Sequence, residues 1–253
     1  MSIEQKKSVL DWVKKARQKK RYQAEGKQII NFLHIGKTGG SAIKFALKDW
    51  AEKPLKNNSV IYLHSHRVGL KDIPKGEKVF FFLRDPISRF KSGFYSRKRQ
   101  GQPRIYSPWS EDEKITFERF ETPNDLAMAL SSPNLEMRKN AEFAIGSIKH
   151  TRLFTQEFFS TKEYLSSRLS DIFFIGFQET LSTDFEILKA KLSLPEDVAL
   201  PNDDIKAHRN PNNLNTKISP EAIENLMNWY KTDLELIQFC HDMIQENPHI
   251  RQK

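Results

Sequence analysis

Residues 29–41 of this protein read Ile29-Ile30-Asn31-Phe32-Leu33-His34-Ile35-Gly36-Lys37-Thr38-Gly39-Gly40-Ser41, and this stretch decides the fold. Its first seven residues form a mostly apolar run of strand length, and a glycine-containing turn follows them. A helical pattern of apolar residues then extends from Ser41 to Trp50. Strand, loop and helix in this order form the repeating unit of sheets whose strands run parallel.

The same alternation recurs further along the chain. Residues 60–63 and 78–83 are typical of strands, and residues 86–98 follow the second of them as a helix. Residues 172–177 form a late strand, which a helical pattern over residues 181–192 follows. Nearly continuous apolar strands that alternate with helices predict a parallel sheet covered on both faces. We therefore expect one P-loop-like α/β domain with a central parallel sheet flanked by helices.

The other segments do not indicate a further domain. Residues 101–170 mix proline-containing turns with short helical patterns, and residues 195–217 are typical of a loop. Ser219 and Pro220 then start a terminal helix, as its N-cap and its first helical residue.

Composition and length exclude several classes of protein. The chain has 253 residues, with 41 Lys and Arg against 32 Asp and Glu, which gives a formal net charge of +9. Its one cysteine, Cys240, excludes an intramolecular disulfide and thiolate-rich metal sites. The longest apolar runs, such as residues 79–83, are far shorter than the roughly 18–20 residues that a bilayer span needs. The N-terminus lacks the apolar region and cleavage site of a secretory signal, so we expect a cytoplasmic protein.

The positive charge is concentrated in two segments. Residues 1–28 and residues 84–104 each carry a net charge of +6, so the remainder of the chain is slightly acidic. The first segment has apolar residues at helical spacing and ends near Gly26. The predicted organisation is therefore a basic N-terminal helix, residues 1–28, followed by the α/β domain, residues 29–253. The charge alone leaves nucleic acid, a membrane surface and a small anion open as partners.

The loop after the first strand is suited to phosphate. A strand-to-helix turn presents free backbone N–H groups at the positive end of the helix dipole, and paired glycines let an anion approach closely. Lys37 adds a mobile cation, while Thr38 and Ser41 add hydroxyl donors. The loop does not match the Walker A motif, because that motif requires glycine at position 31, where the chain has Asn31.

A second anion-binding element follows the strand at residues 78–83. Arg84 comes at the carboxyl end of this strand, and Asp85 and Pro86 are the expected N-cap and first residue of the next helix. Ser92 lies about two helical turns beyond Arg84. Because open α/β sheets bind ligands at the carboxyl ends of their strands, we expect Arg84 to bind a phosphate there bidentately.

Together, residues 36–41 and residues 83–92 resemble the 5′-phosphosulfate loop and the 3′-phosphate motif of sulfotransferases that use 3′-phosphoadenosine 5′-phosphosulfate (PAPS). The resemblance covers residues 29–245 in outline and implies the sulfotransferase fold. The chain departs from the family at Gly36, where a proline commonly precedes the lysine. The residues that the resemblance implies for donor binding are Lys37, Thr38, Gly39, Gly40, Ser41 and Ala42 at the 5′-phosphosulfate, and Arg84 and Ser92 at the 3′-phosphate.

Two later segments also resemble this family. Residues 174–179 are similar to its late strand-turn-helix, and residues 208–210 are similar to the basic loop that closes over the nucleotide. The second likeness implies that Arg209 contacts the cofactor.

A pair of histidines stands between the two anion-binding elements. His64 and His66 follow a strand directly, and their spacing of two places them on the same side of an extended backbone. The pair resembles the His-x-His of the heparan and dermatan sulfate 2-O-sulfotransferases, which implies that His66 is the general base and His64 its neighbour. Histidine titrates near neutral pH and can take the proton of a hydroxyl. Lys37 is the second catalytic candidate, because a cation there would neutralise charge on the departing PAP.

The acceptor is predicted less directly. Arg97, Lys98 and Arg99 come at the end of the helix that begins at residue 86 and would suit an anionic glycan if they line a cleft, so we expect a carbohydrate. A protein tyrosine, a lipid headgroup and a small alcohol stay open as acceptors. We expect no metal and no nucleic acid. The alternatives are a nucleotide-dependent kinase, which would require Mg²⁺, and a module that binds nucleic acid or membrane surfaces through the N-terminal helix.

Overall fold

The computed structural model describes residues 3–103, 105–203 and 216–252, with side chains from residue 14 onward. Within these residues the central sheet has four strands in the order β2 (Ser59–Leu63), β1 (Gln28–Leu33), β3 (Lys78–Leu83) and β4 (Ile172–Phe177). All neighbouring strands run parallel. This confirms the expected α/β class with a parallel sheet. The α-helices are α1 (Ile3–Ala24), α2 (Gly40–Leu47), α3 (Pro86–Lys98), α4 (Glu111–Arg119), α5 (Pro123–Ala129), α6 (Leu135–Ser147), α7 (Lys162–Ser167), α8 (Leu181–Lys191), α10 (Pro220–Trp229) and α11 (Lys231–Glu246).

The strand order places a binding crevice between β1 and β3. From β1 the chain crosses through α2 to β2 on one side, and then returns to β3 on the other side of β1. Such a change of direction leaves a gap beyond the carboxyl ends of the two strands, because the segments that follow them lead to opposite sides. The loop after β1 and the start of α3 after β3 meet there.

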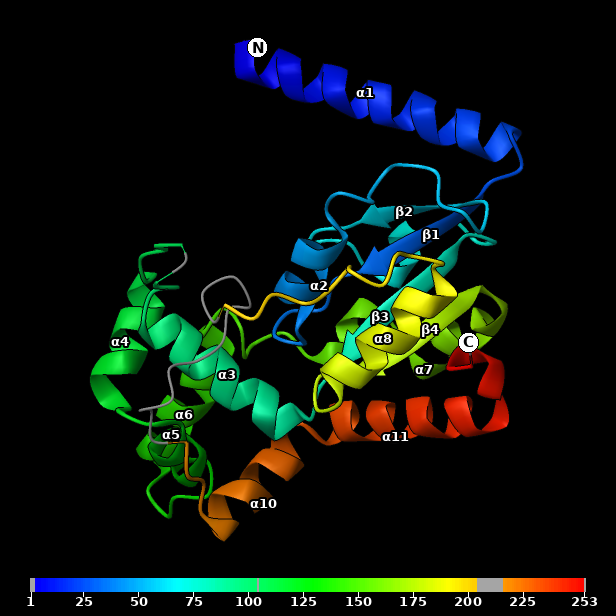
Figure 1. Ribbon diagram of the computed structural model, residues 1–253. Helices are drawn as coiled ribbons and strands as arrows, with labels where there is room; N and C mark the ends of the chain where they lie inside the picture. The colour runs from blue at the N-terminus through cyan, green and yellow to red at the C-terminus, as the bar shows by residue number, and fades with distance from the viewer. Residues whose placement is uncertain (1–2, 104, 204–215, 253) are drawn as a thin grey trace.

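One face of the sheet packs against α2 and α8. Ile30 and Phe32 of β1 alternate with residues that face the opposite side, and they lie in one cluster with Phe80 of β3. Ile43 of α2 and Leu188 of α8 cover this cluster and are fully buried. Figure 1 shows α8 lying over the sheet at this face.

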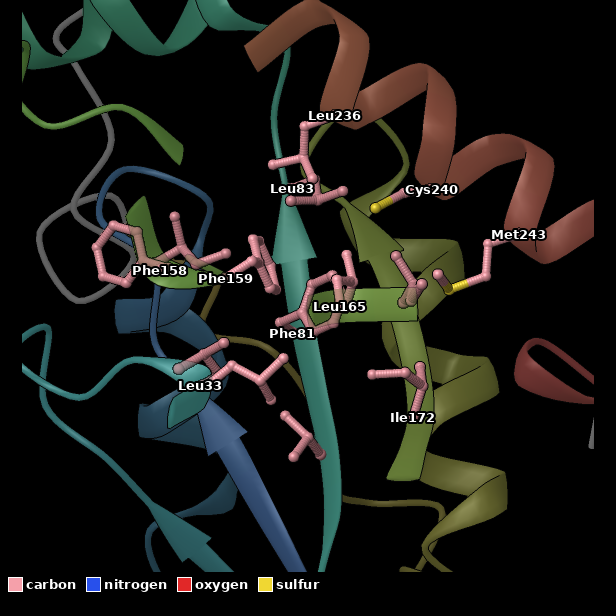
Figure 2. Close-up of a cluster of buried hydrophobic side chains, with 14 of the residues drawn as sticks. Leu33, Phe81, Leu83, Phe158, Phe159, Leu165, Ile172, Leu236, Cys240 and Met243 are labelled. Atoms are coloured by element: carbon pink, nitrogen blue, oxygen red, sulfur yellow. The ribbon is translucent and has the colours of Figure 1, made fainter. Parts of the chain in front are cut away.

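The opposite face packs against α11 and the segment around α7. Leu33, Phe81 and Leu83 point to this side and contact Phe159 and Leu236. Figure 2 shows Leu236 and Cys240 of α11 pointing toward β3 and β4, with Leu33 and Phe159 on the other side of β3. Cys240 of α11 lies in the same cluster, where burial raises the pKa of its thiol to about 12. The single cysteine is therefore part of the core.

The helices α3 to α6 and α10 form a helical layer beside the sheet (Figure 1). Phe90 and Phe94 of α3 pack with Phe117 of α4, Leu126 of α5 and Leu226 of α10. Since Arg84 lies two residues before α3 and Ser92 lies within this helix, the layer fixes one wall of the crevice. No helix in the part of the chain that the structure describes is long and apolar enough to cross a lipid bilayer.

Three predictions about the elements differ from the structure by more than one residue. The first strand ends at Leu33 rather than at Ile35, because the chain turns there into the glycine-containing loop. The helix that follows ends at Leu47 rather than at Trp50. The terminal helix begins at Pro220 as predicted but divides into α10 and α11 at Tyr230, whose buried hydroxyl donates a hydrogen bond to the Thr151 carbonyl (3.1 Å).

Candidate active site

A cavity of about 660 Å³ lies at the carboxyl ends of β1 and β3. Its volume falls within the roughly 300–1,000 Å³ that is typical of small-molecule sites. The loop after β1, the start of α2, Arg84, Ser92 and His66 all line it, together with residues of α8. The fold thus brings together the two anion-binding elements and one histidine of the predicted pair. The charged side chains that line it are those of Lys37, Lys44, Lys48 and Arg84.

The loop between β1 and α2 requires glycine at two positions. Gly39 has a φ of 86°, in the left-handed region, and a Cβ there would lie 2.9 Å from Leu181 Cδ2. A Cβ at Gly40 would lie 2.1 Å from Cδ2 of His34. Gly40 also begins α2, so the first N–H groups of this helix face the loop. The glycines therefore allow the close turn that presents backbone donors to the cavity.

Two arginines at the start of α3 hold the carbonyls of this loop. Arg84 Nη1 donates to the Lys37 carbonyl (3.1 Å), and Arg89 Nε donates to the Gly36 carbonyl (3.1 Å). Arg84 Nε also donates to Ser88 Oγ (2.9 Å). These bonds use two of the five N–H groups of Arg84. Asp85 caps α3 by accepting from the Ser88 N–H (2.7 Å), as the sequence predicts.

Lys37 lies in a strongly cationic environment. Burial and, after it, the charges of Arg84, Arg99 and Arg89 together lower the pKa of its ammonium group to about 7. An ordinary lysine in a protein is paired with an acid or exposed to water. Here the cation is crowded by other cations, an arrangement that an anionic ligand would relieve. The cavity is therefore electrostatically complementary to a phosphate or sulfate group.

Two histidines meet at the wall of the cavity. His66 Nδ1 lies 3.3 Å from the His34 carbonyl oxygen, and the two rings are 3.8 Å apart between centroids. Burial lowers the pKa of His66 below its usual value, so its ring is neutral at pH 7. Burial lowers the pKa of His34 to about 2, with the charge of His66 contributing. His66 is therefore the stronger base of the two.

Among the described residues, sequence reasoning missed two of the three histidines in the cavity, His34 and His150. His150 follows α6 in a turn and lines the cavity, and burial lowers the pKa of its ring to about 2. The turn that carries His150 packs closely against Gly93 of α3, where a Cβ would lie 3.1 Å from the His150 carbonyl oxygen. That contact joins distant parts of the chain, and no spacing in the sequence indicates it.

Two of the predicted site residues, Thr38 and His64, do not line the cavity. Thr38 is buried, and its hydroxyl donates to the Ile35 carbonyl (3.0 Å), so this side chain closes the turn. His64 is not among the lining residues that the structure describes, and its Nε2 lies 2.8 Å from Oδ1 of Asn31. The predicted cofactor contact Arg209 lies outside the described residues.

The predicted acceptor site at Arg97 and Lys98 needs correction. Arg97 is buried, and its Nε and Nη2 each lie 2.7 Å from a carboxylate oxygen of Glu113. Nη1 and Nη2 also donate to the carbonyls of Ser107 and Pro108, so four of the five N–H groups of the guanidinium hold α3 to α4 and the segment before it. Lys98 forms an ion pair with Glu121, whose side chain is exposed.

Arg99 occupies a different environment from these two residues. It is near enough to Lys37 for its charge to lower the lysine pKa. Arg99 therefore belongs to the group of cations near Lys37.

Comparison with known protein families agrees with this geometry. The model of the sulfotransferase family matches residues 20–239, which is more than half of the chain. The chain belongs to the sulfotransferase family. It is accordingly a transferase, and its general reaction is the movement of a sulfuryl group. A search of curated proteins found no match to this sulfotransferase.

Proposed function

We propose that this sulfotransferase moves the sulfuryl group of PAPS to a hydroxyl of a carbohydrate, with His66 as the general base. The observation that supports this most is the composition of the cavity wall. It combines four basic side chains with a neutral histidine, and none of the lining residues in the described part of the chain is acidic. A Mg²⁺-dependent kinase needs acidic side chains near its phosphates, so the wall favours the sulfotransferase over that alternative.

The cavity suits the two charged ends of the donor. Lys37 and the first N–H groups of α2 would hold the 5′-phosphosulfate, and Arg84 and Ser92 would hold the 3′-phosphate. The crowded cation at Lys37 fits such a group, because a bound anion would remove the repulsion that lowers the lysine pKa. When bound, PAPS supplies an activated sulfuryl group on a phosphate leaving group.

The chain's own residues would carry the proton and the charge during transfer. His66 would take the proton of the acceptor hydroxyl at its unprotonated ring nitrogen. Lys37 would neutralise the negative charge that develops on the departing phosphate oxygen, and the loop N–H groups would stabilise the sulfuryl oxygens. Arg84 and Arg89 hold the loop carbonyls, and this leaves the loop in place before the donor binds.

The acceptor side of the cavity supports a glycan. Ile105 lines the cavity and is 64% exposed, and the next residue, Tyr106, is 63% exposed, so an exposed amphipathic side chain adjoins a lining residue in sequence. Lys149 is exposed and close enough to His66 for its charge to lower the histidine pKa. A hydroxyl on an anionic sugar would suit this combination. Membership of the glycosaminoglycan 2-O-sulfotransferase branch and a cytoplasmic location rest on the sequence alone and stay predictions.

Isothermal titration calorimetry with PAP tests the donor assignment. We expect PAP to bind without Mg²⁺, and ADP, which lacks the 3′-phosphate, to bind more weakly. Because the bound anion would raise the lowered pKa of Lys37, binding at pH 8 should take up a proton. The observed enthalpy should then depend on the ionisation enthalpy of the buffer.

The same titration separates the alternatives. Lys37→Ala should abolish the buffer dependence, whereas Lys56→Ala, at an exposed lysine in the loop after α2, should retain it. Binding of ATP with Mg²⁺, together with no binding of PAP, would contradict the donor assignment and favour a kinase.

A further inference from the structure

The basic N-terminal helix makes specific polar contacts with the sheet. Lys19 Nζ lies 2.7 Å from Oε2 of Glu77, and Gln23 Nε2 donates to Oε1 of the same carboxylate (3.0 Å). Glu77 is only 6% exposed and directly precedes β3. A buried carboxylate is costly unless it is paired and hydrogen-bonded. Residues of α1 thus supply two of the partners that keep Glu77 in place.

One face of α1 is used for this contact. Tyr22 packs with Ile29, Val60 and Tyr62 of the two neighbouring strands, and Lys15 pairs with Glu52 (2.7 Å). Positions 15, 19, 22 and 23 lie on one side of a helix, because helical neighbours recur every three to four residues. The exposed lysines and arginines, among them Lys20, lie on the remaining surface. Figure 1 shows α1 running across the β1 and β2 side of the molecule.

The contact continues from Glu77 into β1. Asn31 is fully buried, with apolar residues on both sides of it in β1. Its Nδ2 donates to Glu77 Oε2 (2.9 Å) and to the Lys78 carbonyl (3.1 Å). Both of these partners are acceptors, so the amide nitrogen must face them and the amide oxygen must face the other way. The carboxylate therefore fixes the orientation of the Asn31 side chain.

The chain of bonds ends at His64. Its Nε2 lies 2.8 Å from Oδ1 of Asn31. Because this oxygen accepts and cannot donate, Nε2 must carry the proton, and Nδ1 is the acceptor nitrogen of the neutral ring. The backbone N–H of His64 also donates to the Phe32 carbonyl (3.3 Å), which holds the segment against β1. His64 is two residues from His66, the proposed base.

We propose that α1 positions the His64–His66 segment of the active site through Lys19, Glu77 and Asn31. Lys19 and Gln23 fix the carboxylate, the carboxylate fixes the amide, and the amide selects one tautomer of His64. His64, Asn31 and Glu77 are positioning residues in this account. The catalytic consequence rests on the proposed function, but the tautomer of His64 does not.

Substitutions in the full chain test this chain of contacts. Lys19→Met removes the ammonium group, Lys19→Arg keeps a cation, and Lys20→Met removes an adjacent, exposed lysine as the matched control. Glu77→Gln removes the charge at the centre and keeps the shape. Nitrogen-15 NMR of the histidine rings reports the tautomer of His64, and steady-state kinetics with PAPS report kcat and KM.

We expect Lys19→Met and Glu77→Gln to give a mixture of His64 tautomers. We also expect them to lower kcat by about fivefold, the ratio that corresponds to the net contribution of one hydrogen bond. The KM for PAPS should not change, since these residues do not line the cavity. Lys19→Arg should restore both properties, and Lys20→Met should match the wild type. If Glu77→Gln does not fold, the half-buried Lys19 gives the test by itself.

The outcomes separate this inference from the proposed function. An unchanged His64 tautomer and unchanged kcat in both Lys19→Met and Glu77→Gln would overturn it. If the wild type transfers no sulfuryl group while the His64 tautomer responds to Lys19→Met but not to Lys20→Met, the proposed function fails and the positioning by α1 stands.

Discussion

Replacing Lys37 by alanine is expected to lower kcat for sulfuryl transfer by about 10²–10³-fold, the usual cost of removing one group that stabilises developing charge. The folded protein should not lose stability at the same time. Lys37 is crowded by Arg84 and Arg99 in the cavity, and this repulsion opposes folding when no anion is bound. Kinetics with PAPS and chemical unfolding of the unliganded variant measure the two effects.

The pH dependence of unfolding gives a signed test of this environment. The pKa of Lys37 is about 7 in the folded protein and about 10.5 without its surroundings. Protonated Lys37 is therefore less stable in the folded protein than in the unfolded chain. This lowers the unfolding free energy by its full amount below pH 7, and the loss disappears as the pH rises to about 10.5. The unfolding free energy of the wild type should rise across this interval relative to that of Lys37→Ala. A variant that loses stability at pH 7, or one that keeps wild-type turnover, would contradict the assigned role.

Replacing His66 by alanine is expected to lower kcat by about 10²–10⁴-fold, the range that a positioned general base contributes. The other histidines of the cavity should not replace it, because the pKa values of His34 and His150 are near 2 and such rings are weak bases. Turnover should be measured across pH 4.5–8 for the wild type and for His249→Ala, at an exposed histidine outside the cavity lining.

The wild-type profile should show the titration of the base. Burial lowers the pKa of His66, so kcat should be constant at neutral pH and should fall as the pH drops through a value below 6.5. His249→Ala should show the same fall of kcat at low pH. The remaining activity of His66→Ala should not show this fall. Wild-type turnover in His66→Ala would remove this residue from the mechanism.

Much of the fold was predictable because its signals are local. The strands β3 and β4 are continuous apolar runs, and the structure gives them the predicted bounds. The helix α3 also has its predicted bounds, since Asp85 and Pro86 mark its start. The break at Tyr230 was not predictable, because residues on both sides of it follow one helical pattern and the tertiary contact of the tyrosine interrupts it.

The candidate site was predictable only where one short segment carries it. The phosphate loop and Arg84 were found because glycines, cations and strand ends adjoin in sequence. The burial of Arg97 was not predictable, because its partner Glu113 lies on another helix. There Glu113 also forms a capping box with Ser110. His150 and the contact from Lys19 to Glu77 join segments that only the fold brings together. Side-chain charge alone did not distinguish a structural cation from a ligand-binding one.

The central claim is tested most directly by transfer of radiolabelled sulfuryl from PAPS to a panel of glycans, phenols and simple alcohols, with EDTA present. We predict label on a glycan hydroxyl, at a rate that Lys37→Ala and His66→Ala reduce by at least about a hundredfold and Lys56→Ala does not. Absence of label on every acceptor from a protein that binds PAP would contradict the proposed acceptor class. Transfer that the two cavity variants leave unchanged would contradict the site itself.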